Sequence, residues 1–500
     1  MTRLCALLLL VLPAAAQDIL VLTPDDFAPA LAAWRKHREA QGHAIVVRAP
    51  GDDPAAVVRE VAGNGALKFV LVVGDVKQVP TGTFKAEIIA DFGEDDPNVA
   101  HDNHLADLDG DDLPDLAVGR IPADHPKEAE LMLGKVVAYE TSTDFSPWRR
   151  RVNILAGVGG FGAAADAALE MATTHFLKAS VPASLDLHVT YCNPNSPFCP
   201  PPGSMGKLVL ERFNEGALIV AYMGHGSRLR LDRLIFNRRV YDIFDDEAVY
   251  SLEARHGPPI VFFCACSTGH VDGAPDSLAE VAMKQPKGPI AVIASSRVSM
   301  PYANGVLSKE LLDALFGDRA ATLREALALA KPRTVNPRPD DRNRLLIEQM
   351  AVFWSTPEKR AKEKREHVFL YNLFGDPALR IPRPAEATLE VAEEAALGGR
   401  LKVAGTSPVS GEAIVELVME RTPLVPRRAG DSDKEFAECY ENANRWAKAR
   451  TTVRVADGRF EAELTVPKDI GTGRYDVRVY VHGAGGAAMG SRPIRVVEGP

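Results

Sequence analysis

Short, uniformly apolar runs that alternate with amphipathic stretches are the feature that most narrows the fold of this 500-residue chain. The runs are rich in Val and Ile and apolar at successive positions, so both faces of each must be buried. That pattern is typical of a largely parallel sheet in an α/β domain, with helices on both faces. Helices are expected between the runs, for example over 29–42 and 166–180. The runs span residues 18–23, 44–49, 68–75, 152–158, 185–191, 217–224, 258–265 and 288–295.

The pattern changes after Pro384. Residues 385–500 alternate apolar with polar side chains and are interrupted by glycine turns, which predicts an antiparallel β-sandwich of immunoglobulin type. A polar stretch over 427–448 is expected to be an insertion in this sandwich. Since 500 residues are too many for one hydrophobic core, we expect several units. These are an N-terminal α/β subdomain (17–147), a second α/β subdomain (148–384) that carries the catalytic residues proposed below, and the sandwich (385–500).

The first sixteen residues have the layout of a secretory signal peptide. Arg3 precedes a short apolar run, and three alanines, Ala14 to Ala16, follow it. The run is too short to span a bilayer, and no later apolar stretch is long enough. We therefore expect a mature chain without a transmembrane segment that is secreted, periplasmic or held at the cell surface. A net charge of −9 and the lack of a basic stripe argue against nucleic acid as a partner.

Export would leave five cysteines in an oxidising compartment, and five is an odd number. Cys192 and Cys199 share a Pro- and Asn-rich loop, where a local disulfide is plausible. Cys264 and Cys266 form a C-x-C motif at the end of an apolar run, and Cys439 stands alone. At least one thiol therefore has no disulfide partner and needs another explanation.

Two of the predicted strands end in residues suited to nucleophilic catalysis. The run 217–224 leads into Gly224-His225-Gly226-Ser227, and the run 258–265 leads into Cys266. The segment between them has the length of a crossover, which predicts neighbouring strands and places His225 and Cys266 in one crevice. An imidazole can take the proton of a thiol, and the amides of Gly226 and Cys266 could stabilise an oxyanion.

Simpler explanations of these residues remain open from the residues alone. A cysteine at the end of a buried strand is usually a small core residue, and a G-H-G sequence can be a tight turn. The C-x-C motif could be a redox or metal pair, although no second Cys/His pair has the spacing of a zinc site. Cys264 should point to the same side as Cys266 but lie deeper, where packing is its expected role.

Six segments, in order, resemble the gingipain-type cysteine peptidases, whose peptidase domain has a caspase-like fold. This resemblance covers essentially residues 18–382 and implies that Cys266 is the nucleophile and His225 its base. It implies a cysteine endopeptidase that acts on proteins or peptides through a thioester acyl-enzyme. A sandwich after the peptidase domain also looks like that family. The segments are LVVGDVKQVP (71–80), DLAVGRIP (115–122), ALIVAYMGHGS (217–227), IVFFCACSTGHVD (260–272), GPIAVIASSR (288–297) and LFGDPALRI (373–381).

The resemblance also suggests a pocket for the residue before the scissile bond. In gingipains an acidic residue upstream of a G-R-I/F motif selects Arg or Lys, and Asp102 falls near that place, one residue off in spacing from Gly119-Arg120. A buried carboxylate would bind a guanidinium in bidentate fashion. The alternative is a solvated loop residue. The motifs do not place a third group that orients the imidazole. Asp75 is one candidate, and the alternative is that Gly74-Asp75 only closes a turn.

An acidic loop follows Asp102. Asp107, Asp109, Asp111 and Asp115 occupy positions 1, 3, 5 and 9, a spacing that suits a hard cation needing several oxygen ligands. The loop is not an EF-hand, because its glycine is at position 4 and the Glu at position 12 is missing. We expect structural Ca²⁺ here. The alternative is an acidic turn exposed to solvent.

Two other functions are compatible with the sequence. The chain could be a non-catalytic relative of the gingipains that serves secretion or adhesion at the cell surface and uses the sandwich to bind partners. A carbohydrate-binding role would rest on the sandwich alone, where no aromatic platform is evident. The charged run 358–367 is expected to be a solvated helix face rather than a processing site. The sequence indicates no oligomeric state.

Overall fold

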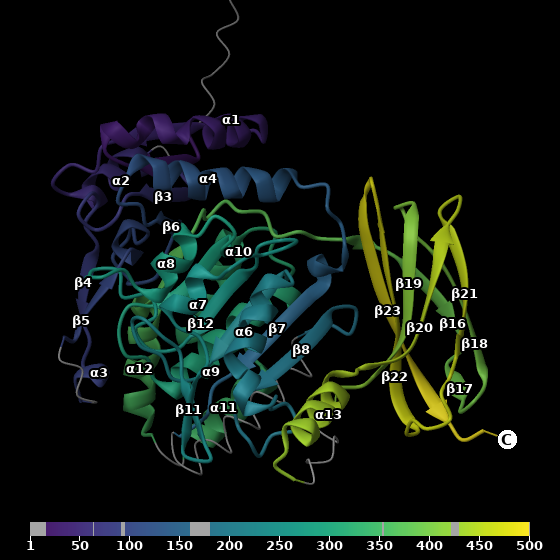
Figure 1. Ribbon diagram of the computed structural model, residues 1–500. Helices are drawn as coiled ribbons and strands as arrows, with labels where there is room; N and C mark the ends of the chain where they lie inside the picture. The colour runs from purple at the N-terminus through teal and green to yellow at the C-terminus, as the bar shows by residue number, and fades with distance from the viewer. Residues whose placement is uncertain are drawn as a thin grey trace, which may run out of the picture.

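All eight apolar runs predicted as strands lie in one ten-stranded sheet (Figure 1). The computed structural model describes residues 17–63, 65–91, 96–160, 181–352, 355–421 and 430–499. The strand order is β2-β1-β3-β6-β14-β13-β12-β9-β7-β8. The hydrophobic pattern did not predict two of these strands, β6 and β14, which overlap the motifs at 115–122 and 373–381. The strands are β1 (Ile19–Leu22), β2 (Ile45–Arg48), β3 (Phe69–Val73), β6 (Ala117–Ile121), β7 (Arg151–Ala156), β8 (Asp186–Tyr191), β9 (Ile219–Met223), β12 (Ile260–Cys264), β13 (Ala291–Ser295) and β14 (Tyr371–Phe374).

The sheet changes direction once, between β13 and β14. These two strands pair antiparallel, whereas every other pair in the sheet is parallel. The half that contains β7, β8, β9, β12 and β13 therefore has its carboxyl ends at one edge of the sheet. The half that contains β1, β2, β3 and β6 has its carboxyl ends at the opposite edge. Side chains that directly follow strands of different halves therefore lie at opposite edges of the sheet.

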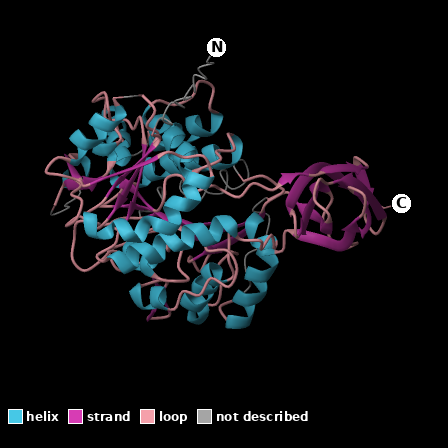
Figure 2. Ribbon diagram, turned by 90° about the horizontal axis from the view of Figure 1, so that it is seen from above, coloured by secondary structure: helices cyan, strands magenta, loops and turns pink. Residues whose placement is uncertain are grey.

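Helices cover both faces of this sheet (Figure 2). One layer includes α4, which contacts both α1 and α8, and another layer is formed by α9 to α12. Two hairpins, β4–β5 and β10–β11, form separate two-stranded sheets. The helices are α1 (Ala32–Ala40), α2 (Pro54–Ala62), α3 (Ile88–Asp91), α4 (Pro126–Thr141), α6 (Met205–Asn214), α7 (Asp246–Tyr250), α8 (Leu278–Lys284), α9 (Pro301–Leu312), α10 (Leu323–Val335), α11 (Arg342–Ala351) and α12 (Pro357–Leu370), and the hairpin strands are β4 (Gly82–Lys85), β5 (Asn98–His101), β10 (Arg233–Phe236) and β11 (Arg239–Asp242).

The C-terminal residues form two facing sheets with a core of their own, as the alternating pattern predicted (Figure 2). One sheet has the order β15-β23-β22-β19-β20, with β17 also paired to β23, and the other has the order β16-β18-β21. The immunoglobulin type of this sandwich stays a prediction. The strands are β15 (Ala385–Glu386), β16 (Thr388–Val391), β17 (Glu394–Ala396), β18 (Arg400–Thr406), β19 (Gly411–Met419), β20 (Ala447–Val455), β21 (Arg459–Thr465), β22 (Gly473–Gly483) and β23 (Gly486–Val497).

The polar insertion in the sandwich contains helix α13 (Asp433–Asn444), which leaves the sandwich and packs on the α/β domain (Figure 1). The side-chain amide of Asn444 bonds to both backbone groups of Val189, at 2.8 Å and 2.9 Å, on the terminal strand β8. The hydroxyls of Tyr440 and Thr190 lie 2.8 Å apart. The apolar side of this helix is completed by Phe436, which is fully buried in the core of the α/β domain.

A buried ion network joins the sandwich to the α/β domain. Glu416 of β19 accepts hydrogen bonds from Arg150, at 3.0 Å, and from Arg478, at 2.7 Å. Arg478 also pairs with Asp186 of β8, at 2.9 Å. Because Glu416, Arg150 and Arg478 are almost fully buried, each charge depends on the others for compensation.

Four expectations about particular segments have different outcomes. The helix expected over 29–42 is shorter, since a 3-10 turn (Asp25–Leu31) precedes α1. The helix expected over 166–180 and the signal peptide over 1–16 lie outside the described residues. The prediction of a local disulfide is wrong, because Cys192 and Cys199 are buried thiols. Cys192 Sγ lies 3.4 Å from Met205 Sδ. Among the described residues, we find no helix with the length and apolar character that a membrane span requires.

Candidate active site

The strands that precede His225 and Cys266 are parallel neighbours, as predicted. The last residues of β9 and β12 are register partners, so each of the two side chains follows its strand by two residues. The turns after the strands pack against each other at Gly226. A Cβ atom at Gly226 would lie only 2.8 Å from Ala265 Cβ and 3.0 Å from the Cys266 carbonyl oxygen. The second glycine of the G-H-G turn is therefore needed for this close approach.

The Cys266 side chain is partly exposed and faces the loop that enters α9. Its sulfur accepts from the Ser299 N–H at 3.4 Å and lies 3.6 Å from the Ser299 carbonyl oxygen. The next residue, Ser267, has a φ of 54°, a left-handed conformation that non-glycine residues rarely adopt. Its N–H donates to the Arg297 carbonyl at 2.9 Å. Unfavourable backbone geometry of this kind is often found where a side chain must be presented for chemistry.

Cys264 lies deeper than Cys266 on the same side of the sheet, as predicted for a packing residue. Its sulfur accepts from Ser308 Oγ at 3.3 Å and lies beside Tyr371. Burial raises the pKa of the Cys264 thiol to about 11, so this thiol stays protonated at neutral pH. Because the thiolate is the reactive form, Cys266 is the member of the C-x-C motif that can serve as nucleophile.

His225 is oriented by a backbone carbonyl. Its Nε2 lies 2.9 Å from the carbonyl oxygen of Gly159, in the segment after β7. A carbonyl oxygen only accepts hydrogen bonds, so Nε2 carries the proton in the neutral imidazole. Nδ1 is then the nitrogen that can take up a proton. Sequence reasoning missed Gly159, since a glycine after a strand gives no signal of this role.

The loop beneath Cys266 is held by a second histidine that sequence reasoning also missed. Burial lowers the pKa of His367 to about 4, so the imidazole is neutral. Its Nδ1–H donates to the Glu363 carbonyl at 2.7 Å, and its Nε2 accepts from the Met300 N–H at 3.0 Å. This pair of bonds fixes the residue directly after Ser299.

Asp102, predicted to bind a basic substrate side chain, instead pairs with Arg120 inside the chain. Its two oxygens accept from Arg120 Nε and Nη2 at 2.9 Å and 2.7 Å. Asp102 is buried, and the charge of Arg120 helps to lower its pKa against the effect of burial. Arg120 also donates to the carbonyls of Gly74 and Val79 at 3.0 Å each. The carboxylate thus holds Arg120, which joins the motifs at 71–80 and 115–122, and this geometry does not fit the predicted substrate role.

The prediction that Asp75 orients the imidazole is wrong. It follows β3, whose carboxyl end lies at the edge of the sheet opposite to Cys266, because the strand direction reverses between β13 and β14. The charged groups that act on Asp75 are Arg120, Asp124 and Lys284, and burial raises its pKa.

The acidic loop brings three of its four predicted ligands together. Each of Asp107, Asp109 and Asp111 offers one carboxylate oxygen, and the three oxygens lie within 4.8 Å of one another. Asp115 stands outside this group, with one oxygen accepting from the Leu108 N–H at 2.8 Å. Asp112, at the position where similar loops have glycine, has a φ of 71°. Oxygen donors on a tight loop fit the preferences of Ca²⁺.

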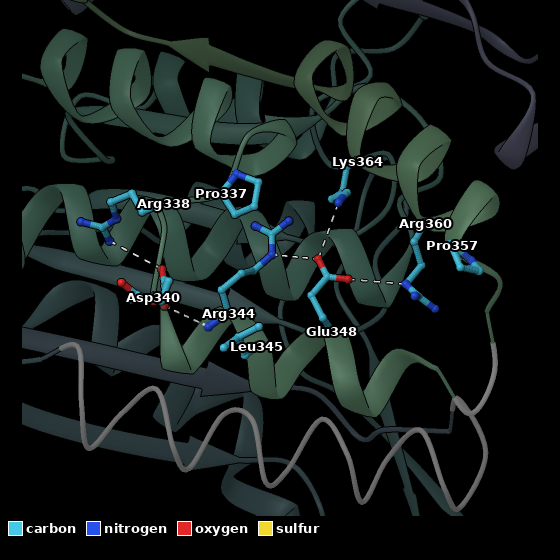
Figure 3. A pocket seen from close by; sticks show the side chains of 10 residues that line it. Pro337, Arg338, Asp340, Arg344, Leu345, Glu348, Pro357, Arg360 and Lys364 are labelled. Carbon is cyan, nitrogen blue, oxygen red and sulfur yellow. Dashed lines mark hydrogen bonds and ion pairs between the residues drawn. The ribbon is translucent and has the colours of Figure 1, made fainter.

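A cavity of about 460 Å³ between α11 and α12 was not foreseen from the sequence (Figure 3). Arg344, Arg360 and Lys364 converge there on Glu348, at 3.0, 3.5 and 3.5 Å. Tyr302 of α9 donates to the same carboxylate at 2.7 Å. The charges of the cavity lining nearly cancel, because three carboxylates (Asp340, Asp341 and Glu348) face four cations (Arg338, Arg344, Arg360 and Lys364).

Known proteins resemble this chain over its α/β part and in its fold. A family model described as Peptidase family C25 matches residues 13–382. Gingipain R2 of Porphyromonas gingivalis is 23% identical over 329 residues, which are 64% of this chain and 38% of the gingipain. Gingipain R1 of the same organism is also 23% identical, over 29% of its own length. The chain thus spans well under half the length of these curated relatives.

Solved structures extend the likeness to nearly the whole chain. The crystal structure of the Arg-specific cysteine proteinase gingipain R gives a TM-score of 0.55 at 16% identity, covering 97% of this chain and 99% of that one. Another protease structure gives 0.57 at 15% identity, with 97% and 98% covered. These matches concern the fold, and the large, mostly parallel sheet fits the expected caspase-like architecture. Since the family model also covers well over half of the sequence, the chain belongs to peptidase family C25, a family of cysteine-type endopeptidases.

Proposed function

We propose that this protein is a secreted or surface-associated endopeptidase that hydrolyses protein or peptide substrates through Cys266 and His225. The observation that carries the proposal is the packing of the two turns at one edge of the sheet, where β9 and β12 end side by side. Export is inferred from residues 1–16 of the sequence. Family membership supports the reaction class.

The chemistry follows from the groups at that edge. Nδ1 of His225 takes the proton of Cys266, and the thiolate attacks the carbonyl carbon of the scissile bond. The negative charge that forms on the substrate oxygen is stabilised by backbone N–H groups, for which Gly226 and Cys266 are the candidates. Collapse of this intermediate expels the amine, which His225 protonates, and leaves a thioester that water hydrolyses.

The Gly226 N–H is suited to the oxyanion role. Within the part of the chain that the structure describes, no hydrogen bond uses this N–H, although the neighbouring Ser227 N–H donates to Arg230 O at 2.8 Å. An N–H group kept available beside the nucleophile costs free energy unless a ligand accepts from it. This supports Gly226 as one of the two donors.

Residue preference and calcium are separate parts of the proposal. The expected preference for Arg or Lys depended on Asp102, which is paired with Arg120, so this carboxylate gives the preference no support. Structural Ca²⁺ is proposed at Asp107, Asp109 and Asp111, with Asp115 as a further ligand if it releases Leu108. There the ion would offset the repulsion between carboxylates on one short loop.

The proposal is tested with fluorogenic peptides that carry Arg, Lys, Asp or Leu before the scissile bond, in the presence of calcium and reductant. Cys266→Ala is the control, and a thiol-reactive peptide should label the wild type but not His225→Ala. We expect hydrolysis that disappears in Cys266→Ala. Absence of hydrolysis of every peptide, together with an unreactive Cys266, would favour the non-catalytic secretion or adhesion role.

A further inference from the structure

Asp232 lies at the start of the β10–β11 hairpin, seven residues after His225, and its carboxylate contacts both segments that orient the imidazole. The backbone N–H of His225 lies close enough to this carboxylate to lower its pKa. Its Oδ2 also accepts from the Val158 N–H at 3.0 Å. Val158 precedes Gly159, whose carbonyl accepts from His225 Nε2. One carboxylate therefore holds the residue that carries the imidazole and the residue beside the carbonyl that sets its tautomer.

Tyr222 links the same two residues through its hydroxyl. The Tyr222 hydroxyl donates to the His225 carbonyl oxygen at 2.8 Å and accepts from the Asp232 N–H at 3.3 Å. Two glycines leave room for this arrangement. A Cβ at Gly157 would lie 2.8 Å from Asp232 Oδ2, and a Cβ at Gly224 would lie 2.6 Å from the Tyr222 oxygen. Side chains at these positions would therefore separate the groups that meet around His225.

The groups that face Asp232 carry little compensating charge. Tyr222, from β9, and Cys192, after β8, are both buried, and burial raises the pKa of each well above its usual value. Burial likewise raises the pKa of Asp232, while the Val158 N–H and the nearby His225 act in the opposite direction. A cation beside this carboxylate is stabilised by it, and His225 becomes such a cation when it accepts the proton of Cys266.

We propose that Asp232 is a positioning residue of this active site, which holds His225 in its reactive orientation and stabilises the imidazolium that forms there. The role rests on the proposed function and deepens it, since it names a residue that acts on the proposed base. Asp232 acts through His225 and contacts no substrate. Its charge and its hydrogen bonds make separable contributions, because asparagine removes the charge and keeps an acceptor.

The test compares Asp232→Asn with wild type and with Asp242→Asn, which removes one exposed acidic charge from the same hairpin. The rate of Cys266 alkylation by iodoacetamide is followed by peptide mass spectrometry from pH 5 to 9. We expect the midpoint of this profile to rise by about one pH unit in Asp232→Asn, which lowers the rate at neutral pH about tenfold. Asp242→Asn should keep the wild-type profile. A wild-type profile in Asp232→Asn would overturn the proposal.

Two further variants keep the proposal testable if Asp232→Asn does not fold. Asp232→Glu retains the charge but displaces the carboxylate, so we expect kcat to fall at least about tenfold with little change in KM. Tyr222→Phe removes the link to the His225 carbonyl and should lower kcat without moving the alkylation midpoint. Wild-type kcat in both variants would refute the positioning role. A wild type without Cys266-dependent hydrolysis would instead refute the peptidase itself, whatever the alkylation profile.

Discussion

Replacement of Gly226 by alanine tests whether the close contact between the histidine and cysteine turns sets the activity. The new Cβ would lie 2.8 Å from Ala265 Cβ, 2.9 Å from Thr268 Cγ2 and 3.0 Å from the Cys266 carbonyl oxygen, whereas ordinary contacts begin at 3.4 Å. Two of these three atoms belong to the backbone or to a Cβ and cannot rotate away. The turns must therefore separate by roughly half an ångström.

The expected effect on catalysis is similar in free energy to the effect on stability, since a tenfold loss of rate corresponds to about 1.4 kcal/mol. A displacement of about 1 Å costs roughly a hundredfold in rate, so half of that should lower kcat/KM about tenfold. Overpacking of this size should lower the free energy of unfolding by about 1–3 kcal/mol. The N–H of residue 226 is kept, so a loss of rate reports the separation of the turns and not the loss of a donor.

Gly305→Ala is the matched control, because nothing lies within 4 Å of a Cβ at that position in α9. An alanine in a helix should leave activity unchanged and raise the free energy of unfolding by about 0.5–1 kcal/mol. Peptide hydrolysis and urea unfolding are measured for both variants. Wild-type kcat/KM in Gly226→Ala would show that the packing of the two turns does not control the geometry of the site.

Three other perturbations address the supports of the site. The unfolded chain protonates histidine near pH 6.5 but folded His367 only near 4, so the free energy of unfolding should fall by about 3 kcal/mol as the pH is lowered through this window. His367→Gln should lose that part of the pH dependence in urea titrations, and an unchanged dependence would contradict a buried neutral imidazole. Glu416→Gln removes the carboxylate shared by Arg150 and Arg478 and should lower the free energy of unfolding by about 3–5 kcal/mol, which would appear as an earlier or divided thermal transition. Glu412→Gln, on the same strand but exposed, should have little effect. Calcium at a hundredfold excess over its Kd should add about 2.7 kcal/mol to the free energy of unfolding, and Asp109→Asn should abolish the gain, whereas equal stabilisation of that variant would exclude the acidic loop as the site.

The sheet could be predicted from the sequence because its strands are apolar on both faces and stand apart from the polar helices. All eight runs became strands of one sheet, and the predicted adjacency of the strands before His225 and Cys266 is confirmed. The strands β6 and β14 were missed because they contain residues such as Arg120 and Asn372, which are buried but polar. Their polarity hides them from a pattern based on hydrophobicity.

Long-range partners of charged residues could not be predicted. Asp102 looked available for a substrate because nothing local indicates that Arg120 would occupy both of its oxygens. The run 358–367 was read as solvated, yet α12 buries Glu363, Glu366 and His367. These side chains accept hydrogen bonds from the backbone N–H groups of Ala303, Ile88 and Met300, respectively. Charges of this kind are placed by tertiary contacts, which leave no periodic signal in the sequence.

The antiparallel pairing of β13 with β14 is a further case. No local sequence pattern indicates the direction of a strand within a sheet. Asp75 was therefore considered as a partner of the imidazole, although it lies at the opposite edge of the sheet. Asp232 was missed for a related reason, since its partners Val158 and His225 come from two different strand ends.

The contact of α13 with β8 has a consequence for how the chain is made. Thr190 and Tyr440, which meet in the finished protein, are 250 residues apart. At 5–20 residues per second, the ribosome needs roughly 12 to 50 s to supply the helix after the strand has emerged. Until then Val189 lacks its Asn444 partner, and an unpaired strand edge is a template for other chains. A chain that ends at residue 384 would keep this edge of β8 unpaired permanently. We therefore expect the sandwich, through α13, to protect the preceding domain from aggregation once it has been synthesised.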